Sequence, residues 1–82
     1  MKPGDVSIWH THHSPPIVYI VSGTFRLEMD GREAVVLRAG QSMAEPVGVV
    51  MRAVNPSKTE DAELVIVQVA DPSKPFLDEV KR

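Results

Sequence analysis

Two histidines separated by a single residue form the feature of this sequence whose spacing has a direct chemical reason. They are His10 and His12, which end the run Val6-Ser7-Ile8-Trp9-His10-Thr11-His12. In an extended strand, residues i and i+2 lie on one face about 7 Å apart at Cα, so both imidazoles can converge on one ion. The same face would also carry Val6 and Ile8. Two interpretations stay open for the pair alone: a metal site, or two histidines at the edge of the core that hydrogen-bond to neighbours.

Two other side chains near this motif bear on its chemistry. Strand alternation turns His13 away from His10 and His12, which predicts a histidine in a surface loop. Glu45 precedes Pro46 and would supply a carboxylate, but we expect it to be solvated, as a glutamate beside a turn usually is. The sequence has no cysteine, so a thiolate metal site and a thiol nucleophile are excluded. Nothing marks a nucleophile or a pair of acid–base carboxylates.

The histidines must be positioned by strands, because the apolar residues alternate or form short blocks instead of recurring at helical spacing. These residues make up 43% of the chain and are punctuated by 7 prolines and 5 glycines. Expected strands cover 6–12, 17–21, 24–29, 49–54 and 64–69, and residues 75–82 are expected to form a short helix or a tail. Short strands separated by turn residues predict an all-β fold, either a small antiparallel barrel or a double-sheet roll.

The hairpin that follows the third of these strands has a predicted register. Asp30-Gly31 is a strong signal for a two-residue turn. In that register Phe25 faces Val36, and Glu28 faces Glu33, a like-charge pair.

The spacing of the glycines and histidines resembles the two sequence motifs of the cupin superfamily. The matching residues are Gly4, His10, His12 and Gly23 in the first motif, and Gly40, Pro46, Gly48 and Asn55 in the second. The resemblance implies a small antiparallel cupin β-barrel of jelly-roll type. It would be a single domain of residues 1–82, shortened at the N-terminus.

The resemblance also implies a metal site, which this sequence alters. Cupins typically hold their metal with two histidines, a glutamate and a third histidine, but Pro16 stands at the glutamate position and Met51 at the third-histidine position. We therefore predict a metal site of His10, His12 and Met51. Two nitrogens and a thioether suit copper or another divalent ion, and oxygenase chemistry on a small molecule is the family's commonest precedent. The alternative is that Met51 fills the core of a metal-free cupin that binds or senses a small ligand.

Composition limits the partners. With 9 Lys+Arg against 11 Asp+Glu and no run of basic residues, nucleic acid is not expected. The longest apolar stretch, Ile17–Val21, is far too short to span a bilayer. No secretory signal is evident, so we expect a cytoplasmic protein, with a trimmed exported form left open. An edge strand that is missing before Gly4 would need covering, which predicts a homodimer beside the small-molecule ligand.

Overall fold

The computed structural model describes residues 1–82, and all its regular elements are β-strands. They are β1 (His10–Thr11), β2 (Ile17–Ser22), β3 (Thr24–Met29), β4 (Val35–Arg38), β5 (Ser42–Ala44), β6 (Met51–Val54), β7 (Glu63–Val67) and β8 (Asp78–Glu79). Nothing in the structure is a helix able to cross a membrane. The all-β, antiparallel architecture predicted from the sequence is confirmed.

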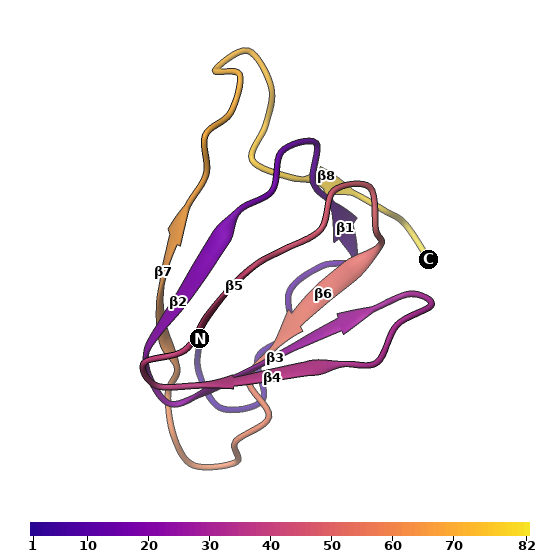
Figure 1. Cartoon of the computed structure of the whole chain (residues 1–82). Coiled ribbons are helices and arrows are strands. Elements are labelled where there is room, and N and C mark those ends of the chain that lie inside the picture. The colour runs from indigo at the N-terminus through magenta and orange to yellow at the C-terminus, as the bar shows by residue number, and fades with distance from the viewer.

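The strands form two sheets between which the chain passes repeatedly (Figure 1). The larger sheet has the order β4-β3-β6-β1-β8, and the smaller has the order β5-β2-β7. Because β1 belongs to the first sheet and β2 to the second, the segment after His12 carries the chain from one wall to the other. The histidine motif therefore lies where the two walls are connected.

The core lies between the two sheets and contains one apolar cluster. Its buried members are Val18, Ile20, Phe25, Leu27, Leu37 and Met51. Alternation along β2 buries Val18 and Ile20, which removes their side chains from water and favours the fold. β2 is the central strand of its sheet, as its apolar sequence indicated, but its outer face is exposed to solvent.

The hairpin between β3 and β4 has a different register from the predicted one. Phe25 pairs with Leu37 and not with Val36. The turn holds one residue more than predicted, and within it the N–H of Arg32 donates to the carbonyl of Met29 at 3.4 Å. A slip of one residue moves every side chain of a strand to the other face. The observed register buries Leu37 and leaves Val36 46% exposed, so core packing accounts for it.

The predicted like-charge pair is also wrong. Glu28 lies opposite Arg52 of β6 and not opposite Glu33. Its carboxylate receives Nε of Arg52 at 2.7 Å and Nε of Arg26 at 3.2 Å. The hydrogen bond from Arg52, and then the charges of both guanidinium groups, hold the pKa of Glu28 below its usual range.

The C-terminal residues form neither the helix nor the free tail that we expected. β8 pairs with β1, with Glu79 opposite His10, and the N–H of Val80 donates to the carbonyl of Trp9 at 2.8 Å. Figure 1 shows this segment running back alongside β1 to the C-terminus. The guanidinium of Arg82 lies 4.1 Å from the centroid of the Trp9 ring. The edge of β1 that faces away from β6 is therefore covered by the chain itself.

Candidate metal centre

The two histidines of the motif meet in the interior. The His10 side chain comes from β1 and that of His12 from the residue after it, and their exposed fractions are 4% and 2%. Their ring centroids lie 4.9 Å apart with the planes at 79°. The predicted convergence of the two imidazoles is thus observed.

Backbone carbonyls fix the orientation of both rings. Nδ1 of His10 lies 2.7 Å from the carbonyl oxygen of Ile8, and Nδ1 of His12 lies 3.1 Å from that of Phe76. A carbonyl only accepts, so in each neutral ring the proton is on Nδ1 and Nε2 carries the free lone pair. This is how histidine ligands are usually oriented in metal sites.

The third member of the cluster is Glu45, which we expected to be solvated. The structure corrects this: Glu45 is 6% exposed, and its Oε1 lies 3.3 Å from Nε2 of His12. One ligand atom from each of Glu45, His10 and His12 lies within 4.8 Å of the others. Three groups typical of a metal site are therefore buried together.

The position of Glu45 follows from strand pairing. Ala44 of β5 pairs with Ile17 of β2, and the N–H of Glu45 continues this ladder by donating to the carbonyl of Pro16 at 2.8 Å. Pro16 occupies the position that the cupin resemblance gives to glutamate, so the carboxylate comes from the strand opposite. One signal was available in the sequence: period two places Glu45 on the same face as Met43, which packs against the core.

Burial controls the electrostatics of the cluster. It raises the pKa of Glu45 to about 7, because a charged carboxylate loses hydration there. Burial is also the largest cause that lowers the pKa of His12, opposed by its hydrogen bond to Phe76 and reinforced by the nearby His10. Both effects disfavour charge on these two side chains, so a cation that compensates Glu45 would be stabilised there.

The other predicted residues lie elsewhere. Met51 is directly opposite His10 in register and wholly buried, but it packs in the apolar core and does not line the cavity beside the histidines. Its role as a ligand stays a prediction. His13 lies in the loop after β1 and outside the cluster, as predicted, but its residue is only partly exposed and both its ring nitrogens are buried without a hydrogen-bond partner.

The expected continuous strand over residues 6–12 is interrupted. Val6 and Ile8 are 54% and 48% exposed, so they do not share the buried face of the histidines. Ser7 lines the same cavity as His10, three residues later, which strict alternation forbids. The break in alternation turns the Ile8 carbonyl toward the His10 ring.

Comparison with known families identifies the fold. A family model described as Cupin domain matches residues 1–68. The chain belongs to the cupin family. No curated protein matches this cupin.

Three solved structures are similar to this cupin. A cupin domain from Bordetella pertussis Tohama I is 33% identical, with a TM-score of 0.62, over 83% of this chain and 73% of that one. KdgF from Halomonas sp. is 32% identical, with a TM-score of 0.59, over 78% of this chain and 56% of that one. A conserved protein of unknown function from Streptococcus pyogenes is 23% identical, with a TM-score of 0.68, over 84% of this chain and 57% of that one, and shows the fold alone. This cupin thus spans little more than half the length of two of these proteins.

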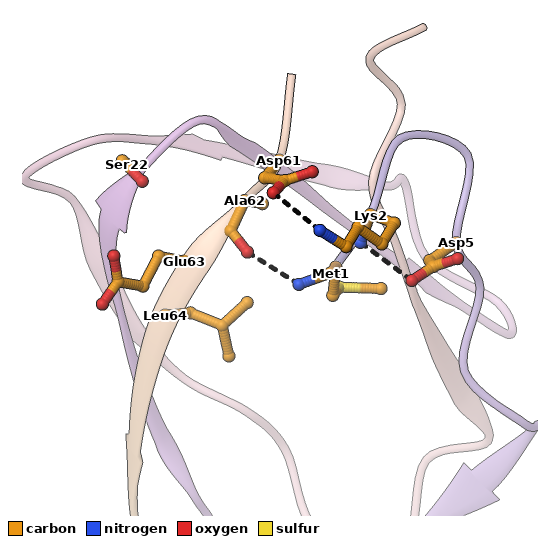
Figure 2. A pocket seen from close by; sticks show the side chains of 8 residues that line it. All are labelled: Met1, Lys2, Asp5, Ser22, Asp61, Ala62, Glu63 and Leu64. Atoms are coloured by element: carbon orange, nitrogen blue, oxygen red, sulfur yellow. Dashed lines mark hydrogen bonds and ion pairs between the residues drawn. The ribbon is translucent and has the colours of Figure 1, made fainter. Parts of the chain in front are cut away.

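A cavity of about 210 Å³ adjoins the cluster. Its lining comprises Met1, Ser7, His10, His12, Phe25, Glu45, Ala53, Leu64, Ile66, Phe76 and Leu77. A larger hollow near the N-terminus, shown in Figure 2, contains no histidine, and Lys2 and Asp61 on its rim pair with each other at 3.2 Å. Of the two, only the smaller cavity is lined by both histidines and Glu45.

Proposed function

We propose that this cupin binds a divalent metal ion through His10, His12 and Glu45 and uses it in oxygenase-type chemistry on a small molecule. The observation that carries the proposal is the buried cluster of two imidazoles with free Nε2 lone pairs and one carboxylate. Two histidines and one carboxylate are the donor set of non-haem iron(II) oxygenases.

Glu45 changes the metal that the site favours. The sequence suggested copper because a site of His10, His12 and Met51 lacks a carboxylate. With Glu45 in the cluster, the set has two borderline nitrogens and one hard oxygen. Such a set suits iron(II), manganese(II) or zinc(II) at least as well as copper. Met51 remains a candidate only as an additional thioether donor.

The chain's own residues would perform four tasks in this function. Nε2 of His10 and Nε2 of His12 would hold the ion, while the carbonyls of Ile8 and Phe76 keep the rings in place. Glu45 would neutralise one positive charge, and the apolar walls would exclude water. A bound divalent ion would supply Lewis acidity and, where it is redox-active, an electron-transfer centre.

The test is metal binding by protein purified without a nickel column. We expect one equivalent of iron(II), manganese(II) or zinc(II) by calorimetry and elemental analysis. Glu45→Gln should weaken binding by roughly 10–100-fold or more, because it removes a ligand charge. Glu33→Gln, at an exposed position in the β3–β4 turn, is the matched control and should bind like the wild type.

Two outcomes decide between the ligand sets. Metal binding that His10→Ala, His12→Ala and Glu45→Gln leave unchanged would refute the proposed centre. Copper binding that is weakened by Met51→Leu but not by Glu45→Gln would instead support the set predicted from the sequence.

A second candidate function is a metal-free cupin that binds or senses a small ligand. It is favoured by the distance of 3.3 Å between Nε2 of His12 and Oε1 of Glu45, since a protonated Glu45 would donate to that nitrogen without an ion. Thermal-shift screening separates the two functions, since a ligand at about 100 times its dissociation constant stabilises a protein by about 2.7 kcal/mol. Shifts with organic molecules and none with metals would favour this candidate.

A further inference from the structure

The polar groups of the cavity are concentrated in one cluster. His10, His12 and Glu45 supply it, and the remaining polar residue, Ser7, is already engaged. Its hydroxyl donates to the carbonyl of Ile8 at 3.0 Å and accepts the N–H of Ala53 at 2.8 Å. A ligand therefore finds free polar partners at one place only.

The other side chains of the wall are apolar, and the one cationic group among these residues, the amino group of Met1, is hydrogen-bonded to the carbonyl of Ala62. These residues are Met1, Phe25, Ala53, Leu64, Ile66, Phe76 and Leu77. Neither lysine nor arginine lines the cavity. A charged group on the body of a ligand would be buried against hydrocarbon without a counter-charge, which is strongly unfavourable.

The C-terminal segment closes one side of this cavity. Residues 69–82 lie beyond the part of the chain that the family model matches, yet they contribute Phe76 and Leu77 to the wall. The Phe76 ring meets the His12 ring edge-on, at 5.1 Å between centroids. Pairing of β8 with β1 holds the segment in place. Because Phe76 is 43% exposed, it lies at the boundary between the cavity and solvent.

The N-terminal residue closes another side. Met1 and Leu64 line both the cavity and the hollow of Figure 2, so they separate the two spaces. The amino group of Met1 donates to the carbonyl of Ala62 at 2.8 Å, which holds this partition. The cavity volume of about 210 Å³ is smaller than that of most pockets for drug-sized ligands, which start at roughly 300 Å³.

We infer that this cavity takes a compact ligand with an uncharged apolar body and a single polar end, and that Phe76 sets the upper limit of its size. The inference deepens the proposed function and rests on it in one respect, since the polar end would face the metal centre. Selection against a charged body and against bulk is a property of the walls, so it is measurable without metal.

The charge arm compares two phenols of the same outline on protein treated with a chelator. The probes are 4-methylphenol and 4-hydroxybenzoate, which share the hydroxyl end and differ in a methyl or carboxylate at the other. By calorimetry or NMR titration, 4-methylphenol should bind at least about tenfold more tightly. Equal affinities, or tighter binding of 4-hydroxybenzoate, would overturn the inference.

The size arm uses 2-naphthol as the bulkier probe. Phe76→Ala should raise the affinity for 2-naphthol relative to 4-methylphenol by about tenfold, because it removes the ring at the rim. If the alanine variant does not fold, Phe76→Leu replaces it. Leucine keeps an apolar side chain at this position, so the change in affinity should be smaller but in the same direction. Tyr19→Ala, which removes an exposed aromatic ring on β2, is the control. An unchanged probe ratio in a folded Phe76 variant would refute the role of Phe76.

These results are independent of the metal titration. A cupin that discriminates the probes but binds no metal would retain the inferred ligand class and lose the proposed function. A cupin that binds metal but does not discriminate the probes would lose the inference alone.

Discussion

Glu45 places a carboxylate beside the two histidines although the sequence motif has none at its usual position. Pro16 removes the glutamate expected from the family, and the chain offers a carboxylate from the residue bonded to the Pro16 carbonyl. The carboxylate is 6% exposed and its pKa is raised to about 7. Keeping this carboxylate charged without a partner costs folding free energy. A buried carboxylate of this kind therefore suggests a role in binding.

The raised pKa of Glu45 makes the stability of the metal-free protein depend on pH. Its folded-state pKa of about 7 lies above the ordinary value of 4.5. The folded state therefore binds more protons than the unfolded state between these values, and the free energy of unfolding falls as pH rises through that window. His12 acts in the opposite direction, because its pKa is lowered from 6.5 and its contribution is lost as pH falls below that value.

We expect Glu45→Gln to be more stable than the wild type at pH 8 in the presence of a chelator. The gain is at most about 3 kcal/mol, because the amide removes the ionisation that burial opposes and can still donate to His12. At pH 5 the difference should be much smaller. Urea unfolding at both pH values measures this, with Glu33→Gln as the control. A stability difference that does not change with pH would show that the carboxylate is not buried as described.

At the scale of elements, the site depends on segments that bring backbone carbonyls to the two histidines. The Ile8 carbonyl comes from the break before β1, and the Phe76 carbonyl comes from the segment before β8. β5 delivers Glu45 through its pairing with β2. Loss of any of these contacts would move the side chains of His10, His12 or Glu45 out of position even though their identities were unchanged.

Gly23, between β2 and β3, lies very close to the backbone of Asp61 and Ala62, just before β7. Gly23 has a φ of +79°, and a Cβ there would lie 2.4 Å from the Asp61 carbonyl oxygen. Gly31 has a similar φ of +71° but open space around its Cα. We expect Gly23→Ala to destabilise the protein by about 2 kcal/mol or more beyond Gly31→Ala, since only the first adds a backbone clash to the strain. Equal unfolding free energies in urea would contradict this close approach.

The whole molecule leaves one apolar surface uncovered. The outward side chains of β2 and β7 form it, namely Ile17, Tyr19, Val21, Val65 and Val67, each 43–57% exposed. β7 also has a free edge, because it pairs with β2 alone. A contiguous apolar face beside an unpaired strand edge is typical of an interaction surface.

The homodimer predicted from the sequence would use this surface. The sequence predicted a dimer that covers an open edge of the barrel, but the edge of β1 is covered by β8 of the same chain. The reason to expect a dimer is now the exposed apolar surface of β2 and β7. We expect a dimer at micromolar concentration by size-exclusion chromatography with light scattering, and Val65→Lys should shift it toward monomer. Val36→Lys, at a residue of similar exposure on β4, should leave the oligomeric state unchanged. A wild-type monomer would refute the prediction.

The amino-acid pattern by itself determined the strand class and the inward residues of the longest strands. Alternation correctly placed Phe25 and Leu27 in the core, and the His-x-His spacing correctly brought two imidazoles together. These features are local, because the period of a strand is set by its own backbone. The family motifs extended the local pattern to a cupin barrel.

Only the tertiary structure decided the composition of the site. Glu45 joins the histidines because β5 lies beside β2, and His12 is oriented by Phe76, 64 residues away in the chain. The register of the β3–β4 hairpin likewise depended on packing, which favoured a buried Leu37 over the shortest turn. Contacts between distant segments are set by how the two sheets pack, and no period within a strand encodes them.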